Sequence, residues 1–166
     1  YMDDLTKISN RRYCEKVMEE LSSNNENFGI FSFDLNNLKK INDNMGHTYG
    51  DDLISGFARI LKETFEKEAV VGRMGGDEFI VIIRSDDGRI DYETFRKKLQ
   101  HVIDEYNHKE SRFKYSVACG YADSTEAGDN NGNVDARQIY SMADDRMYVH
   151  KRKIKEKMKQ EKSHNE

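Results

Sequence analysis

Three acidic residues are the positions in this chain whose types and spacing could support chemistry. Asp77 and Glu78 directly follow Gly75 and Gly76 in the run VVGRMGGDEFIV, and Asp34 lies at the end of the mostly apolar run FGIFSFDL. Carboxylate oxygens are the ligands that hard cations such as Mg²⁺ prefer, and a cation held in this way can also hold nucleotide phosphates. Taken alone, Gly-Gly-Asp-Glu is equally compatible with an ordinary acidic hairpin tip.

Apolar runs must position these carboxylates. The segments 69–71 and 79–83 flank the two glycines, which favours a β-hairpin with a primed turn, because glycine takes positive φ without strain. The segment 28–35 has the composition of a buried central strand. If these strands are neighbours in one sheet, Asp34 and Asp77 converge at one edge. One or two Mg²⁺ could then bind there with a triphosphate, as in phosphoryl or nucleotidyl transfer.

Other polar and basic residues could contact the phosphates. Asn37 precedes a short predicted helix at 38–44, so the backbone amides of Asn37 and Leu38 could donate to phosphate oxygens at the same edge. In the last predicted helix, Lys151 and Lys155 lie one turn apart on one face. Both could neutralise the β- and γ-phosphates.

The remaining pattern predicts one layered domain. We find no internal repeat and no linker, so a single α+β or α/β domain over 1–166 is the simplest interpretation. Apolar periodicity predicts helices over 11–21, 51 to about 66, 92–107 and from 134 onward, a strand over 113–121, and an exposed loop over 122–133.

The charge distribution argues against a nucleic-acid partner. The net charge is −4, but residues 146–166 carry eight Lys or Arg against three acids. We therefore expect a core at about 3–151 and a basic helical tail at 152–166, without the broad basic face of a nucleic-acid binder. Cys14 and Cys119 have neither metal-ligand nor secreted-scaffold spacing, which favours reduced thiols in the cytoplasm. The sequence contains no apolar run of membrane-spanning length.

Together, five collinear segments resemble a GGDEF domain, the catalytic domain of diguanylate cyclases. Besides GGDEF at 75–79, the matching segments are DDLTKISNRR from residue 3, FDLNNLKKINDNMGHTYGD from 33, VACGYA from 117 and ADDRMYVHK from 143. The resemblance covers the chain from about 3 to 151. It implies an α+β fold similar to nucleotide cyclases and polymerase palms, with a central, mostly antiparallel sheet of about five strands surrounded by helices.

The resemblance also implies a reaction. Two GTP molecules would condense into cyclic di-GMP with release of two pyrophosphates, in a homodimer that holds one GTP in each subunit. Asp34, Asp77 and Glu78 would be the catalytic and metal-binding side chains, and Leu35 would add its backbone carbonyl. The metal would be Mg²⁺ or Mn²⁺.

Base and phosphate contacts follow from the same resemblance. Asn42 and Asp51 match the guanine-binding pair, and a carboxylate can accept from guanine N1–H and N2–H₂, which adenine lacks. We expect substrate contacts from Asn37, Leu38, Lys39, Asn42, Asp51, Gly75, Gly76, Lys151 and Lys155.

The chain departs from the family pattern in three places. The family ends its last helix with Gly-Arg-Asn before a final strand, whereas this chain has Ile-Lys-Glu at 154–156. We expect the helix to run on through about Lys159, which leaves open whether the final strand exists. Lys155 would replace the arginine as a phosphate-binding cation, without the bidentate fork of a guanidinium. The Arg-x-x-Asp inhibition motif falls on EKEA at 66–69, so product inhibition there should be absent or weak. Asn36 and Leu38 replace the usual Asp and Phe.

The activity of the domain and the partner of Arg73 stay open from the sequence. The domain could bind GTP without turnover and regulate a partner domain, or it could be another nucleotidyl cyclase, although Asp51 predicts that ATP is refused. Arg73 could reach an acidic neighbour across the turn or the active site of a partner. Because family domains usually follow sensor or membrane segments and this chain opens on Tyr1, we expect such a domain N-terminal to it in a longer protein.

Overall fold

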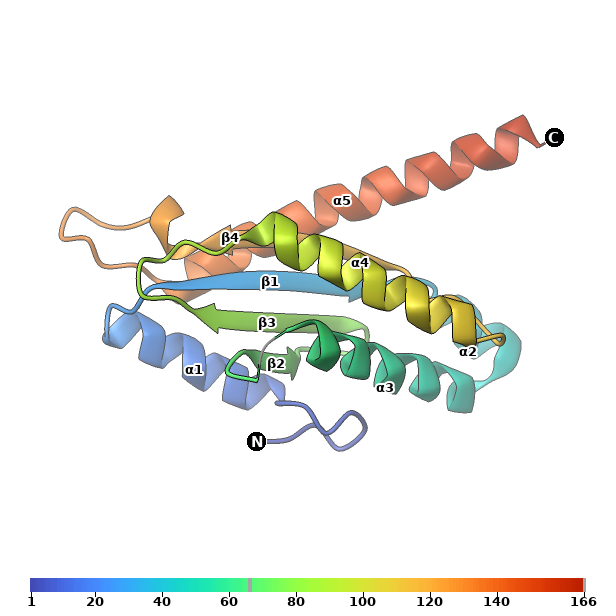
Figure 1. The fold of residues 1–166 in the computed structure, drawn as a ribbon, viewed down its shortest axis with the longest axis horizontal. Helices are drawn as coiled ribbons and strands as arrows, with labels where there is room; N and C mark the ends of the chain where they lie inside the picture. The colour runs from blue at the N-terminus through green and yellow to red at the C-terminus, as the bar shows by residue number, and fades with distance from the viewer. Residues whose placement is uncertain (66, 166) are drawn as a thin grey trace.

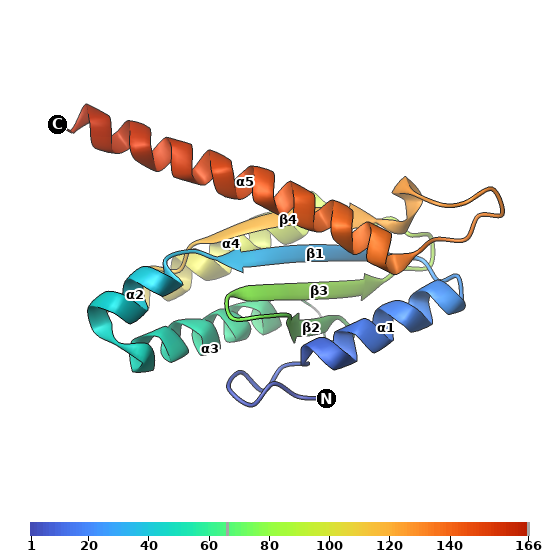
Figure 2. The ribbon, with the colours of Figure 1, turned by 180° about the vertical axis from the view of Figure 1, so that it is seen from behind.

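The structure, a computed structural model, describes residues 1–65 and 67–165. It contains an antiparallel sheet in the order β2-β3-β1-β4 with helices on both faces (Figures 1 and 2). The α+β prediction is confirmed, but the described residues form four strands in this sheet and not five. The elements are α1 (Arg11–Ser23), β1 (Phe28–Leu35), α2 (Leu38–Met45), α3 (His47–Thr64), β2 (Val70–Arg73), β3 (Glu78–Arg84), α4 (Tyr92–Lys109), β4 (Val117–Asp123), a 3₁₀ turn (Ser124–Glu126) and α5 (Ala136–His164).

Strand β1 is central and pairs antiparallel with both β3 and β4. All eight of its residues are buried, as expected for a strand that is covered on both faces. Phe31, Phe33 and Leu35 belong to the core beneath α3 and α4, whereas Phe28 and Ile30 belong to a second core beneath α1 and α5. The mostly apolar run that predicted this strand therefore serves two cores at once.

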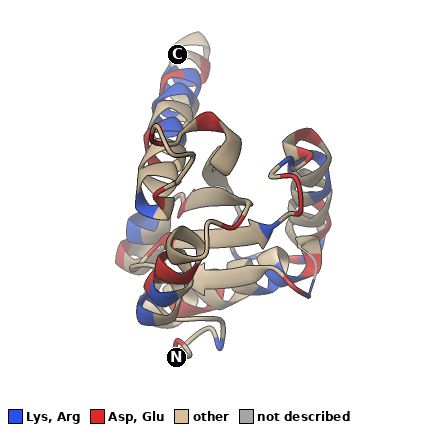
Figure 3. Cartoon of the chain, turned by 90° about the vertical axis from the view of Figure 1, so that its left-hand side faces the viewer, with Lys and Arg blue, Asp and Glu red and all other residues tan. Residues whose placement is uncertain are grey.

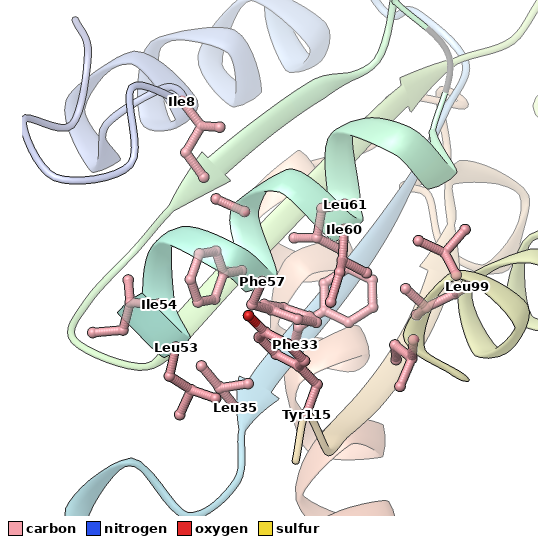
Figure 4. Close-up of a cluster of buried hydrophobic side chains, with 14 of the residues drawn as sticks. Ile8, Phe33, Leu35, Leu53, Ile54, Phe57, Ile60, Leu61, Leu99 and Tyr115 are labelled. Atoms are coloured by element: carbon pink, nitrogen blue, oxygen red, sulfur yellow. The ribbon is translucent and has the colours of Figure 1, made fainter. Parts of the chain in front are cut away.

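The core beneath α3 and α4 is rich in aromatic side chains (Figure 4). Phe33 lies 6.0 Å from Phe57 and 6.2 Å from Phe65, measured between ring centroids in edge-on arrangements. Leu53 and Leu61 from α3 pack around them and are fully buried. This cluster fixes β1 and α3 relative to each other, and with them the end of β1 that carries Asp34.

On the opposite face, α5 approaches β4 at Gly120. A Cβ atom at Gly120 would lie 2.0 Å from the carbonyl oxygen of Ala143 and 2.3 Å from the amide nitrogen of Met147, so the helix rests on the strand through its backbone. Beyond this crossing α5 projects past the sheet, at the end of the molecule where α2 lies (Figure 2). Lys and Arg recur along the projecting part (Figure 3).

Two predicted boundaries change near the site. Helix α3 begins at His47, four residues before the predicted start, because Gly46 at φ 97° separates α2 from α3 in a single residue. The prediction of a primed turn at Gly75-Gly76 is wrong, since neither glycine has positive φ. The strands are instead joined by the four residues 74–77, closed by a hydrogen bond from the Met74 amide to the Glu78 carbonyl at 2.8 Å.

Strand β4 also differs from its prediction. It begins at Val117 and not at Phe113, although Phe113 and Tyr115 are buried. The Asn107 side chain accepts from the Tyr115 amide at 2.6 Å and donates to the Tyr115 carbonyl at 3.0 Å, which satisfies the backbone without a strand partner. The strand then continues to Asp123, into the predicted loop.

No strand follows α5 in the described chain, because the helix continues to His164, five residues past the predicted Lys159. Its side chains contact the outer edge of β4 instead. His150 Nδ1 accepts from the Cys119 amide at 2.9 Å, and Arg146 donates to the Tyr121 carbonyl at 2.6 Å. Polar groups on an edge strand are thus satisfied without a fifth strand.

Three further sequence expectations stay predictions. The inhibition-motif comparison and the predicted end of the third helix both involve Glu66, which lies outside the described residues, so the product-inhibition prediction stays a prediction. The division into a core at 3–151 and a tail at 152–166 also stays a prediction. Among the helices described, none combines the length and apolarity needed to cross a bilayer.

Candidate active site

The predicted convergence of carboxylates is present at one end of β1. Asp34 is the register partner of Glu78 on β3, and the Leu35 amide donates to the Asp77 carbonyl at 2.8 Å. Pairing β1 with β3 therefore brings Asp34 and the acidic pair after the hairpin loop to the same edge of the sheet. The sheet topology, which the sequence could not fix, places these residues together.

Lys151 joins this group from α5. Its Nζ donates to Asp34 Oδ2 at 2.6 Å, and the Asp34 side chain is only 6% exposed. The second oxygen, Asp34 Oδ1, is buried and has no hydrogen-bond partner among the described residues. A buried carboxylate with one unsatisfied oxygen is unfavourable, so this position suits a further cation.

The surrounding charges change the proton affinities at the site. Burial, and then the negative charge of Asp34, raise the pKa of Asp77. Burial raises the pKa of Glu78, with a further contribution from Asp144. The hydrogen bond to Asp34 raises the pKa of Lys151. The site thus contains more negative charge than one ammonium neutralises, which favours a divalent cation.

Asp144 is a site residue that the sequence interpretation missed. It comes from α5, where its Oδ1 accepts from the Ser32 hydroxyl at 2.9 Å on the α5 side of β1. It precedes Lys151 by seven residues, two helical turns, so both lie on one face of α5. That spacing in ADDRMYVHK was the signal that could have identified it.

A cavity of about 630 Å³ opens beside Asp77, between the end of β1, α2 and the distal part of α5. Four lysines line it, and the acids in its lining are Asp43 and Asp77. Ile154 and Met158 from α5 add an apolar wall, which the sequence interpretation did not include. The cavity therefore suits a polyanion with an apolar part. The four lysines are Lys39, Lys40, Lys151 and Lys155.

The predicted phosphate loop lies at this cavity, whereas the predicted base-binding pair lies next to it. Asn37 and Leu38 line the cavity, with Asn37 in a left-handed conformation (φ 70°) at the start of α2. Asn42 and Asp51 are not part of the lining. The Asn42 amide lies against Gly50, where a Cβ atom would be only 1.8 Å away, and Asp51 is the exposed neighbour of that glycine.

The hairpin loop is held by Arg73. Its guanidinium donates to the Gly75 carbonyl at 3.1 Å and to the Gly76 carbonyl at 3.0 Å, and it pairs with Asp3 at 3.3 Å. Within this chain, Arg73 therefore reaches an acidic neighbour, and Asp3 is a second residue whose role the sequence interpretation missed. A Cβ atom at Gly76 would have nothing within 4 Å, so the space beside Asp77 is open to a ligand.

The described side chains do not by themselves form a complete metal site. Among the described residues, no three His, Cys, Asp or Glu side chains lie together in a geometry that could hold a metal ion. Asp34 and Asp77 nevertheless supply hard oxygen donors, and Asp34 Oδ1 has no other partner in the described chain. This fits a Mg²⁺ that is held by one or two carboxylates and takes its remaining ligands from phosphates and water.

Comparison with known sequences agrees with this geometry. Residues 1–157 match the family described as "Diguanylate cyclase, GGDEF domain". The chain is similar to the signaling protein YkoW of Bacillus subtilis (strain 168), with 32% identity over 164 residues, which are 95% of this chain and 20% of that protein. It is also similar to the diguanylate cyclase DgcS of Shewanella oneidensis, with 27% identity over 150 residues, 88% of this chain and 48% of that protein. The chain therefore spans less than half of either relative.

Comparison with solved structures supports the fold. The coiled coil and GGDEF domain of DgcB from Caulobacter crescentus, crystallised in complex with c-di-GMP, matches with a TM-score of 0.73 and 20% identity. The match covers 91% of this chain and 80% of that chain. At this identity the likeness concerns the fold, and the residues of the site have to be assessed by their own geometry.

Proposed function

The chain belongs to the family of diguanylate cyclase GGDEF domains, and from this membership we propose that it condenses two GTP molecules into cyclic di-GMP and releases two pyrophosphates. The observation that carries the proposal is the meeting of Asp34, Asp77 and Lys151 at a lysine-lined cavity. Two carboxylates and several ammonium groups at one opening are what a metal-bound triphosphate requires.

The carboxylate end of the site would bind Mg²⁺ or Mn²⁺. Asp34 and Asp77 would hold the metal, with Glu78 and the Leu35 carbonyl as further oxygen donors. When bound, the metal would act as a Lewis acid at the α-phosphate and favour the ionised form of the attacking hydroxyl. Asp34 and Asp77 are held in place by the β1–β3 pairing, so little reorganisation is needed when substrate arrives.

The lysine end of the cavity would bind the phosphates that leave as pyrophosphate. Lys39, Lys151 and Lys155 would compensate charge that builds up on the departing oxygens, and the amides of Asn37 and Leu38 would donate to phosphate oxygens at the start of α2. Lys155 lies in this lining one turn beyond Lys151, which supports its role as a phosphate contact.

Asn42 and Asp51 would bind the guanine base. Gly50 lets the Asn42 amide lie directly beside the backbone that carries Asp51, so the two side chains can contact one base edge. An aspartate accepts hydrogen bonds from guanine N1–H and N2–H₂ but finds no such donors on adenine. The proposal therefore includes refusal of ATP.

Catalysis would require a homodimer. Each subunit would hold one GTP, and each 3′-hydroxyl would attack the α-phosphorus of the opposite GTP, with Gly75 and Gly76 leaving room for the approach. We further propose that the domain works in the cytoplasm, where GTP is available, and that the full-length protein carries a sensor or membrane domain N-terminal to it.

The test is a turnover assay with GTP and Mg²⁺ at protein concentrations where analytical ultracentrifugation detects the dimer. Formation of cyclic di-GMP, its loss in Asp77→Ala and its retention in Asp86→Ala would support the proposal, because Asp86 lies in an exposed loop after the far end of β3. Dimeric protein that binds GTP without forming product would instead indicate a regulatory GTP-binding module. Mixed GTP and ATP would reveal another cyclase through the identity of the product.

A further inference from the structure

The Lys151 ammonium lies where a cation is needed to neutralise Asp34. We propose that Lys151 and the divalent metal compete for the charge of Asp34, so that the nucleotide-free protein binds the metal weakly until a triphosphate draws the lysine away. This inference rests on the proposed function of the site, because it concerns the order in which that site fills.

Asp34 is a buried carboxylate with an ammonium beside it. The side chain is 6% exposed, and the Lys151 ammonium at 2.6 Å is its hydrogen-bond partner in the described chain. An ionised carboxylate at such burial requires a counter-charge, and here α5 provides it. The protein therefore neutralises its own metal-binding residue when no ligand is bound.

A metal and the Lys151 ammonium would repel each other at Asp34. A metal that binds Asp34 would share one carboxylate with the ammonium, and charges that are this little exposed are only weakly screened. Asp77 does not remove this conflict, since it and its neighbours form no cluster of three or more metal ligands in the described chain. Metal alone must therefore either bind at Asp34 Oδ1 against the charge of the ammonium on Oδ2, or displace Lys151, whose charge then loses its partner.

Lys151 also faces the cavity in which the phosphates are proposed to bind. Its side chain is 26% exposed and lines the 630 Å³ cavity together with Lys155. A triphosphate in that cavity would offer new acceptors to the ammonium and would add oxygen ligands for the metal. Metal and nucleotide should then bind with positive coupling, each raising the affinity for the other by the same factor.

The test measures Mn²⁺ binding to nucleotide-free protein by electron paramagnetic resonance of the free ion. Lys151→Met should bind Mn²⁺ at least about tenfold tighter than the natural protein, because the competing cation has gone. Lys40→Met is the matched control, since it removes a lysine from the same cavity that has no assigned substrate contact and is no partner of Asp34, and it should leave Mn²⁺ affinity unchanged. A non-hydrolysable GTP analogue should raise Mn²⁺ affinity in the natural protein more than in Lys151→Met.

Two results would overturn the inference. Equal Mn²⁺ affinity of Lys151→Met and the natural protein would show that the lysine does not compete, and equal tightening in both lysine variants would show a general charge effect. If Lys151→Met fails to fold, Lys151→Gln keeps a hydrogen-bond donor without the charge and answers the same question. If Lys151→Met alone bound Mn²⁺ more tightly while the natural protein showed no cyclase activity, the competition would be supported and the proposed turnover refuted. The failure of one proposal can therefore be told apart from the failure of the other.

Discussion

The two faces of the sheet receive adjacent residues of β1 and use them differently. Phe33 and Asp34 are both buried, and as whole residues they are 0% and 4% exposed. Their side chains nevertheless lie on opposite faces of the sheet. On the α3/α4 face the aromatic core covers the strand to its end at Leu35. On the α1/α5 face the apolar core gives way to polar contacts, first Ser32 with Asp144 and then Asp34 with Lys151.

This difference shows that burial by itself does not distinguish a structural residue from a functional one. Phe33 is buried among rings that fill space, and the free energy it contributes depends on their fit. Asp34 is buried beside one ammonium, with one oxygen unsatisfied in the described chain. The α3/α4 face holds the strand in place, so that the opposite face can hold a charge that would be unfavourable elsewhere.

The largest expected effect is on the aromatic face. Phe33→Ala should lower the free energy of unfolding by about 3–5 kcal/mol, because it leaves a cavity between α3 and β1. Urea unfolding followed by circular dichroism measures it, with Phe33→Leu as the control expected to cost less than about 1.5 kcal/mol. A loss below about 1 kcal/mol in Phe33→Ala would contradict the role assigned to this core.

Asp34→Asn tests the neighbouring residue on the other face. The change keeps the shape of the side chain and removes its charge, so turnover should fall by about 10²–10³-fold, which corresponds to roughly 3–4 kcal/mol in the barrier. The melting temperature should change by only a few degrees, because the freed Lys151 is 26% exposed and can be solvated. If Asp34→Asn lost its fold together with its activity, the proposed difference between a structural face and a functional face would be contradicted.

Gly120→Ala tests the contact that positions α5 over the site. The new methyl group would meet backbone atoms of α5 at 2.0 and 2.3 Å, so the helix must shift, at a cost of about 1–3 kcal/mol. GTP-analogue binding should weaken as well, because Lys151 moves with the helix. Gly128→Ala is the matched control, since its nearest atom would lie at 3.6 Å, an ordinary contact. Equal stability of the two variants would contradict the close backbone approach.

Much of the site could be predicted because its residues lie at the ends of strongly patterned segments. The run 28–35 identified a buried strand, and Asp34 within it was conspicuous as a charge among apolar residues. The sequence predicts Lys151 at the same site only as a phosphate contact, and not as the hydrogen-bond partner of Asp34 that the structure shows. Charge in an apolar pattern is visible in a sequence because burying it is costly.

Other features could not be predicted because they depend on tertiary contacts. The prediction of a primed turn is wrong because the hairpin closes at Met74, whose side chain is buried. The loop between β2 and β3 is therefore wider than a two-residue turn. The expected fifth strand is absent from the described chain, where α5 continues and places Arg146 and His150 on the β4 edge. Asp144 can be assigned to the site only once α5 is known to lie over Ser32. Helix periodicity shows which face of a helix is apolar, but it does not show which element packs against that face.

The smallest expected effect concerns the charge of Asp77, whose pKa is raised by burial and by Asp34. The folded state therefore binds this proton more tightly than the unfolded state, and the fold gains stability as the pH falls through the raised pKa. Asp77→Asn is neutral at every pH, so at pH 7, without metal or nucleotide, it should be more stable by about 0.5 kcal/mol after allowance for solvent screening. Thermal unfolding at several pH values should show this advantage disappearing as the pH falls towards 3.8, the ordinary value for aspartate.

Asp87, in the loop after the other end of β3, gives the opposite sign. Hydrogen bonds from the Arg89 amide at 2.9 Å and the Ser85 hydroxyl at 3.0 Å lower its pKa. Asp87→Asn should therefore be less stable than the natural protein at pH 7, and the difference should shrink as the pH falls below 3.8 towards the lowered pKa. If both variants changed stability in the same direction, net charge and not local environment would be the cause. Opposite signs would show that the hairpin-loop end of β3 holds an acid at a cost to folding, a cost that a bound cation is expected to remove.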